Sequence, residues 1–261
     1  MSPFKYTPPL SIPVCHKIFP LGVYENQVSC HAETKTAILH NYESEKFPVK
    51  CSSPLKLPDG RIVQADISKF TGEAHGLATF HKKPQYKVFF SELACHANAY
   101  LRMLGIDEQK TEIYVMKSWL VIHDDHADSM PFHVHPESNI SFVYYAQTLP
   151  CSQSIVFRND SHQNDISPDI FYSDVNSANS LITEETCLNK TEFQLNVREG
   201  MLVMFPGWRT NHGTRMTKPE AFDKDTFVPR LAIAGDLKVV LKPDRLATMT
   251  LSSSLEHWEK L

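Results

Sequence analysis

The spacing of apolar residues predicts one long helix in the first half of the chain. Over residues 84–104 the apolar side chains recur at intervals of one, three and four, which places them in one stripe along a helix. Gly105 follows directly, and glycine is common just after the last turn of a helix. We expect this helix to pack against a sheet rather than to carry chemistry.

Beyond this helix, the apolar residues alternate with polar ones or form short runs, as they do in β-strands. Polar loops join these runs, and no helix-length segment separates them. Short strands in this arrangement are typical of an antiparallel sandwich or barrel, so we predict a mainly β fold with flanking helices. The expected strands are 112–123, 140–147, 154–158, 192–196, 200–205 and 229–241.

The chain before the helix is less regular. Residues 1–82 mix prolines and polar residues with short β-like runs, such as 36–40 and 61–66. We expect them to form an irregular α+β extension packed on a main domain that spans 83–261.

One loop of the main domain is unusually long. The polar stretch 159–190 has few apolar residues, and a loop of this length in a compact domain is usually functional or disordered. It could close over a site as a lid, or it could be an ordered excursion on the surface.

The composition excludes several classes of protein. The chain has 13 histidines but only 9 glycines, and it contains no G-x-G-x-x-G, G-x-x-x-x-G-K-[ST] or G-x-S-x-G motif. A Rossmann dinucleotide site, a P-loop and an α/β-hydrolase nucleophile elbow are therefore not expected. The 6 cysteines are scattered without a C-x-x-C pair, which argues against a zinc ribbon or a thioredoxin-type site.

The charge and the hydropathy of the chain bear on which partners it can bind. The net charge is −4, with no basic stripe for nucleic acid. No apolar run is long enough to span a membrane, and the first residues lack the apolar core of a signal peptide. We expect a cytoplasmic protein with neither a nucleic acid nor a membrane as partner, and a homodimer remains open.

Three histidines occupy positions from which they could bind one metal ion. His133 and His135 precede an expected strand, and residues two apart on an extended segment point to the same side. His212 follows another expected strand, and strand ends distant in sequence meet at one mouth of a barrel. Imidazole nitrogen suits Fe, Zn, Cu and Ni, and three ligands on one face leave positions for substrate and O₂. Surface or hydrogen-bonded histidines would show the same spacing.

Two further patterns compete with this set of ligands. His123 and Asp125 form an H-x-D pair, while His135 and Glu137 form an H-x-E pair. Either pair would complete a triad of two histidines and one carboxylate with His212. Glu137 is the stronger rival because it lies beside the favoured pair.

A charged residue and two tyrosines could form a second part of the site. Arg230 interrupts an otherwise apolar strand, and its planar guanidinium fits a carboxylate through two hydrogen bonds. It is either an anchor for an acidic cosubstrate or one half of a salt bridge. Tyr144 and Tyr145 place one hydroxyl on each face of their strand, and an anionic ligand could be the partner of the inner one.

Taken in order, these residues resemble the iron(II)- and 2-oxoglutarate-dependent oxygenases, above all a bacterial and phage group with an H-x-H-P motif. The resemblance implies a double-stranded β-helix, or jelly roll, with iron at one mouth. Prolyl hydroxylases are more distantly similar. The resemblance covers about residues 84–241 and is carried by Ser118-Trp119, the segment His133 to Ser138, the segment Ser141 to Tyr145, the segment Gly200 to Pro206, His212 and Arg230.

The resemblance also implies roles for individual residues. It makes His133 and His212 iron ligands, with His135, or Glu137 in its place, as the third. It makes Arg230 the partner of the distal carboxylate of 2-oxoglutarate, helped by Tyr145. The resemblance also gives His123, which lies where prolyl hydroxylases carry a tyrosine, a weak cosubstrate contact. Arg215 is a fallback anchor, because the long interval between His212 and Arg230 implies an inserted hairpin around 217–226.

The activity implied by this resemblance is oxidation of a C–H bond, with hydroxylation as the default, coupled to decarboxylation of 2-oxoglutarate to succinate. The substrate would be a small molecule or a peptide, and Trp119, Trp208 and Arg209 are candidates to contact it. Two alternatives are a hydrolase that activates a zinc-bound hydroxide with three imidazoles, and a cupin-like binding protein without catalysis.

Overall fold

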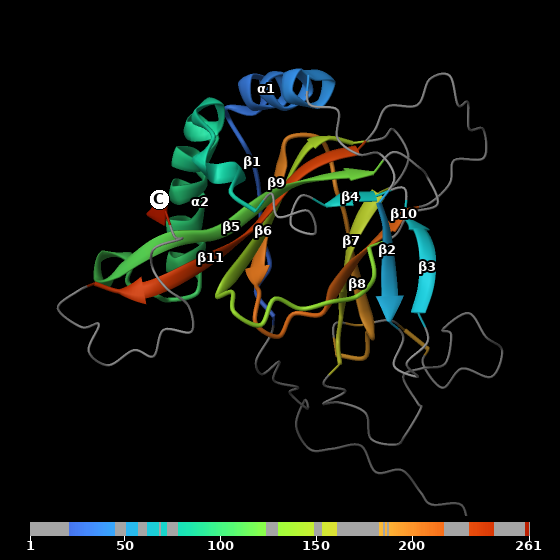
Figure 1. Cartoon of the computed structure of the whole chain (residues 1–261). Helices are drawn as coiled ribbons and strands as arrows, with labels where there is room; N and C mark the ends of the chain where they lie inside the picture. Colours follow the sequence, from blue (N-terminus) through green and yellow to red (C-terminus); the bar gives the residue numbers. More distant parts are fainter. Residues whose placement is uncertain are drawn as a thin grey trace, which may run out of the picture.

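In the residues that it describes, the computed structural model contains a 7-stranded and a 3-stranded antiparallel sheet, a separate 2-stranded one and two long helices (Figure 1). The larger sheet has the strand order β1-β9-β6-β11-β5-β12, and β4 pairs with β5 beside that path. Its strands are β1 (Tyr24–Gln27), β4 (Lys69–Thr71), β5 (Thr111–His123), β6 (Ile140–Gln147), β9 (Met201–Pro206), β11 (Arg230–Leu241) and β12 (Glu259–Lys260). The smaller sheet has the order β10-β7-β8 and consists of β7 (Gln153–Arg158), β8 (Glu192–Asn196) and β10 (His212–Met216). A separate hairpin pairs β2 (Cys51–Lys56) with β3 (Ile62–Ile67).

The structure describes residues 21–44, 51–56, 62–67, 69–71, 78–123, 130–148, 153–160, 183–184, 186, 188–216, 230–242 and 259–260. The predicted lid over 159–190 lies mostly outside these residues, and the predicted inserted hairpin around 217–226 lies wholly outside them. None of the helices formed by the described residues has the length and hydropathy needed to cross a membrane.

The six strands predicted from apolar alternation are all present, and each begins and ends within one residue of its expected bounds. The predicted helix is α2 (Lys87–Met103), preceded by a short 3-10 turn at Pro84–Tyr86. The prediction of a mainly β jelly roll with flanking helices is therefore confirmed.

The prediction of a β-like run at residues 36–40 is wrong, because these residues lie inside α1 (His31–Ser44). Thr34, Thr36 and Ile38 are β-branched and two residues apart, which mimics the period of a strand. In the structure, the hydroxyls of Thr34 and Thr36 donate to backbone carbonyls four residues earlier, at Cys30 and Ala32. Both side chains are thereby accommodated in helical backbone.

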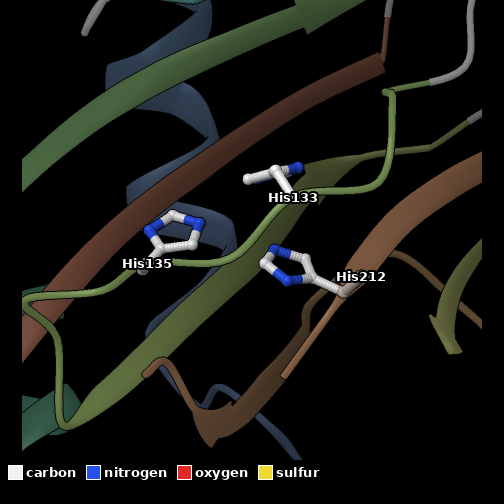
Figure 2. A group of neighbouring side chains, drawn as sticks. All are labelled: His133, His135 and His212. Atoms are coloured by element: carbon white, nitrogen blue, oxygen red, sulfur yellow. The ribbon is translucent and has the colours of Figure 1, made fainter. Parts of the chain in front are cut away.

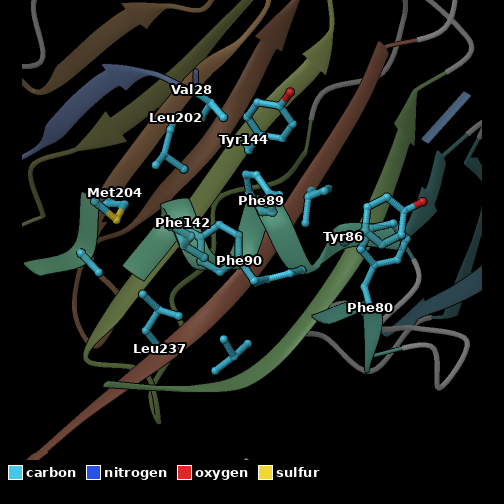
Figure 3. Close-up of a cluster of buried hydrophobic side chains, with 14 of the residues drawn as sticks. Val28, Phe80, Tyr86, Phe89, Phe90, Phe142, Tyr144, Leu202, Met204 and Leu237 are labelled. Carbon is cyan, nitrogen blue, oxygen red and sulfur yellow. The ribbon is translucent and has the colours of Figure 1, made fainter. Parts of the chain in front are cut away.

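Two hydrophobic clusters lie on opposite faces of the larger sheet. The outer cluster joins the sheet to the two helices, and within it the ring of Phe89 on α2 lies 4.7 Å from the ring of Tyr144 on β6 (Figure 3). The inner cluster fills the space between the sheets and includes Tyr145, Ile155 and Phe205. The helices therefore support the sheet from outside, which leaves its inner face for the site.

Candidate active site

His133, His135 and His212 converge at one end of the space between the sheets (Figure 2). Their candidate ligand atoms all lie within 4.8 Å of one another. The backbone builds this arrangement, because His133 and His212 form an antiparallel bridge with two hydrogen bonds of 3.0 Å. The amide of His135 donates to the carbonyl of Gly207, also at 3.0 Å. Residues separated by almost 80 positions in sequence are thus held together by the main chain.

Each of the three imidazoles contacts an oxygen atom through its Nδ1. The Nδ1 atoms of His133 and His212 lie 2.8 and 3.0 Å from the carbonyl oxygens of Pro131 and Thr210. The Nδ1 of His135 lies 2.9 and 2.8 Å from the two carboxylate oxygens of Asp236. Carbonyl and carboxylate oxygens only accept, so each Nδ1 carries a hydrogen, and in a neutral imidazole with this tautomer the lone pair is on Nε2.

This arrangement fits a metal ion. Histidines that bind metals characteristically donate their other ring N–H to a carbonyl or a carboxylate, as all three do here. The Nε2 atom of His135 is also buried and has no hydrogen-bond partner. Burial, followed by the neighbouring His133 and His135, lowers the pKa of His212 to about 3, so its imidazole is neutral and able to act as a ligand.

The carboxylate of Asp236 is almost completely buried, with 1 % of the side chain exposed. Burial alone would raise its pKa, but His135, the Ser141 hydroxyl and the Lys117 ammonium hold it below its ordinary value. Ser141 Oγ donates to it at 2.7 Å, and Lys117 Nζ lies 3.3 Å away. A negative charge is therefore held directly behind His135.

A cavity of about 230 Å³ extends from the histidines into the space between the sheets. Its walls are mostly apolar, with Arg230 and Tyr145 as the other conspicuous polar residues. The guanidinium carbon of Arg230 lies 4.9 Å from the ring centre of Tyr145, and both side chains are buried. Burial raises the pKa of Tyr145, which Arg230 opposes, and it lowers the pKa of Arg230.

Trp119 is one of the predicted substrate contacts, and it also lines this cavity. Its ring stacks on that of His135, with centroids 6.1 Å apart and an interplanar angle of 10°. His123 pairs in register with Arg230 across β5 and β11, which places the two positions side by side at one end of both strands.

The other predicted site residues lie outside the cavity. Glu137 is exposed and is not part of the group of converging ligand atoms. Arg215 is also exposed, and its guanidinium pairs with Glu192 at 2.9 Å. Trp208 and Arg209 occupy the exposed turn after β9, where the guanidinium carbon lies 5.7 Å from the indole ring centre.

Asp236 was not predicted from the sequence as a residue of the site. The residue lies six positions after Arg230 in the same predicted strand, where it too interrupts an apolar run. The reasoning that singled out Arg230, that a charge within a buried strand needs a partner, applies equally to Asp236.

Residues 117–222 match the model of a protein family described as "Putative 2OG-Fe(II) oxygenase". The match includes all three converging histidines. This segment is an iron(II)- and 2-oxoglutarate-dependent oxygenase domain. The match indicates a 2-oxoglutarate-dependent Fe(II) oxygenase, with Fe(II) and 2-oxoglutarate as its cofactors.

Two solved structures share the fold of this oxygenase over most of its length. One is SnoN, described as a non-heme alpha-ketoglutarate-dependent epimerase from nogalamycin biosynthesis, with 11% identity, a TM-score of 0.51 and coverage of 92% of this chain and 93% of SnoN. The other is SnoK, described as a carbocyclase of the same type and pathway, with 12% identity, a TM-score of 0.51 and coverage of 92% of each chain. Identities this low show the fold alone. Among curated proteins, none is similar enough to this chain to count as a match.

Proposed function

We propose that this oxygenase hydroxylates a C–H bond of a small molecule or a peptide. One atom of O₂ would enter the substrate as the hydroxyl oxygen. The other would enter succinate as 2-oxoglutarate loses CO₂. The observation that carries the proposal is the group of His133, His135 and His212, whose candidate ligand atoms lie within 4.8 Å of one another and whose Nδ1 atoms each contact an oxygen.

The three histidines would hold iron(II) through Nε2. The bound metal would supply the activation of O₂. We assign the third ligand to His135 rather than to Glu137, because Glu137 is exposed and does not join the group. A metal held by only these three protein ligands would keep positions open for the 2-oxo acid and for O₂. A halide would have to compete for these positions, so we favour hydroxylation over halogenation.

Arg230 and Tyr145 would hold the far carboxylate of 2-oxoglutarate. Arg230 is 3 % exposed, lines the same cavity as the histidines and presents the donors that match a carboxylate. Arg215 is a poorer anchor, because its guanidinium faces solvent and already pairs with Glu192. The apolar walls of the cavity would keep water away from the reacting groups.

Anaerobic titration of the purified protein tests this proposal. Fe(II) with 2-oxoglutarate should produce a visible charge-transfer absorption, and O₂ should then convert 2-oxoglutarate to succinate. His212→Ala should lose both the absorption and the turnover. Arg215→Ala is the matched control on the same strand, and it should retain both.

The proposal would be overturned if the parent protein gave neither absorption nor succinate under these conditions. Tight binding of zinc together with ester hydrolysis, and no succinate, would indicate a hydrolase instead. An oxidised product that keeps all its original bonds to oxygen, such as an epimer or a new ring, would preserve the oxygenase chemistry but refute hydroxylation.

A further inference from the structure

The three converging histidines are not supported in the same way. His133 and His212 donate through Nδ1 to backbone carbonyls two residues away, so their orientation is set locally. His135 donates to Asp236, which lies 101 residues further along the chain on β11. His135 is thus oriented by an ionised side chain, whereas the other two are oriented by neutral backbone groups.

Asp236 is itself held in place from several sides. Ser141 on β6 donates to Oδ1 at 2.7 Å, and Lys117 on β5 lies 3.3 Å from Oδ2. Asp236 pairs in register with both of these residues, so the two strands that flank β11 each provide one contact. The buried carboxylate is therefore hydrogen-bonded and paired, as a buried charge requires.

The ring of His135 is confined on a second side by Trp119, which stacks on it. The Nδ1 contact fixes the tautomer and the rotation of the ring, and the indole fixes its plane. Together they aim Nε2, the buried atom without a hydrogen-bond partner, at the centre of the group.

We infer that Asp236 is a positioning residue for the metal centre, which orients His135 and places a carboxylate behind a ligand set made only of imidazoles. Many sites with two histidines have a carboxylate as the third ligand. Here the proposed third ligand is the imidazole of His135, and the carboxylate of Asp236 contacts that imidazole instead of the metal. A carboxylate that accepts from the far nitrogen of a histidine ligand makes that ligand more basic. This inference rests on the proposed role of His135 as a ligand.

Binding of Co(II) alone, without 2-oxoglutarate or O₂, tests the inference. Co(II) reports its ligand set through visible absorption bands, and competition with a chelator gives its affinity. Asp236→Asn keeps the shape and one acceptor oxygen but removes the charge. We expect Co(II) binding to weaken about 10- to 100-fold, with a shift of the absorption bands, which loss of stability alone would not cause.

Ser141→Ala is a second, milder variant that keeps the charge and removes one of the contacts that hold it. We expect a loss of affinity of about several-fold, smaller than that of Asp236→Asn. Glu92→Gln is the matched control, because it neutralises a partly buried carboxylate on α2, on the other face of the sheet. It should lower the stability of the fold while Co(II) affinity and absorption stay at the parent values.

The outcomes separate this inference from the proposed function. If Asp236→Asn and Ser141→Ala both bind Co(II) like the parent while His135→Ala does not bind it, the inference fails and the ligand assignment stands. If His135→Ala binds like the parent, both fail. If Glu92→Gln weakens binding as much as Asp236→Asn, the effect is one of general stability, and the inference fails.

Discussion

Glu92 connects the two helices on the outer face of the sheet. Its carboxylate, on α2, accepts hydrogen bonds from the backbone amides of Ser29 and Cys30 at 2.5 and 2.9 Å. These amides precede the first turn of α1, where backbone N–H groups have no partner within the helix. A negative charge at this end also interacts favourably with the helix dipole. Removing the carboxylate should therefore destabilise the docking of α1.

The pKa of Glu92 sets the size of this effect. Burial alone would raise the pKa, but the hydrogen bonds from Ser29 and Cys30 lower it from 4.5 to about 2. At about 1.4 kcal/mol per pKa unit, this difference corresponds to a ceiling of about 3 kcal/mol. The side chain is 18 % exposed, and solvent screens part of the interaction. We expect Glu92→Ala to lower the free energy of unfolding by about 2 kcal/mol at pH 7.

The effect has a defined dependence on pH. Because folding lowers the pKa of Glu92, its contribution is fully present above pH 4.5 and is lost as the pH falls towards 2. Urea unfolding at several pH values, followed by circular dichroism, would measure the difference between the parent and Glu92→Ala. That difference should shrink steadily below pH 4.5.

Glu25→Ala is the control for this experiment, because Glu25 pairs with Arg198 at the surface and should contribute less than about 0.5 kcal/mol. The reasoning is refuted if Glu92→Ala is as stable as Glu25→Ala at pH 7. It is also refuted if the loss is the same at pH 3 as at pH 7.

Three further substitutions test other parts of the structure. Arg230→Met should weaken 2-oxoglutarate binding to the Co(II)-loaded protein at least about 30-fold in calorimetry, with Co(II) affinity unchanged; a change below threefold would place the anchor elsewhere. Phe89→Ala should lower the free energy of unfolding by about 3–5 kcal/mol in urea, because the side chain is 1 % exposed, and a loss below about 1 kcal/mol would contradict the packing of α2. Gly213→Ala places a Cβ 2.7 Å from the carbonyl oxygen of Met130, so we expect the free energy of unfolding to fall by about 1–3 kcal/mol and Co(II) binding to weaken. Parent values for both would show that Gly213 and Met130 are not this close.

The central strands of the larger sheet could be predicted well from the sequence, because β5, β6, β9 and β11 bury many of their side chains in regular local patterns. In β6 and β9 almost every position is buried, so a continuous apolar run was a sufficient signal. Helix α1 could not be predicted in the same way. Its β-branched residues imitate a strand, and the group that binds the amides at its start, Glu92, is more than 60 residues away.

Some residues of the candidate site could likewise be predicted from local sequence patterns, and others could not. The histidines could be found because H-x-H and the end of a strand are local patterns, and the structure brings those three together. The contact of Asp236 with His135 depends on the register of β11 against β6, in which Asp236 lies opposite Ser141. A single sequence contains no local signal for that register, so the role of this carboxylate emerges only from the folded chain.

One strand, β11, carries both ends of the proposed site. Arg230, Ala232 and Ala234 line the cavity, and Asp236 is the next residue on the same face. At about 3.3 Å per residue, the two charged positions are about 20 Å apart along a strand paired on both sides. The strand therefore fixes the distance between Arg230, the proposed anchor for the far carboxylate, and Asp236, which contacts His135. Lengthening a loop would leave that separation unchanged, because both residues belong to one continuous strand.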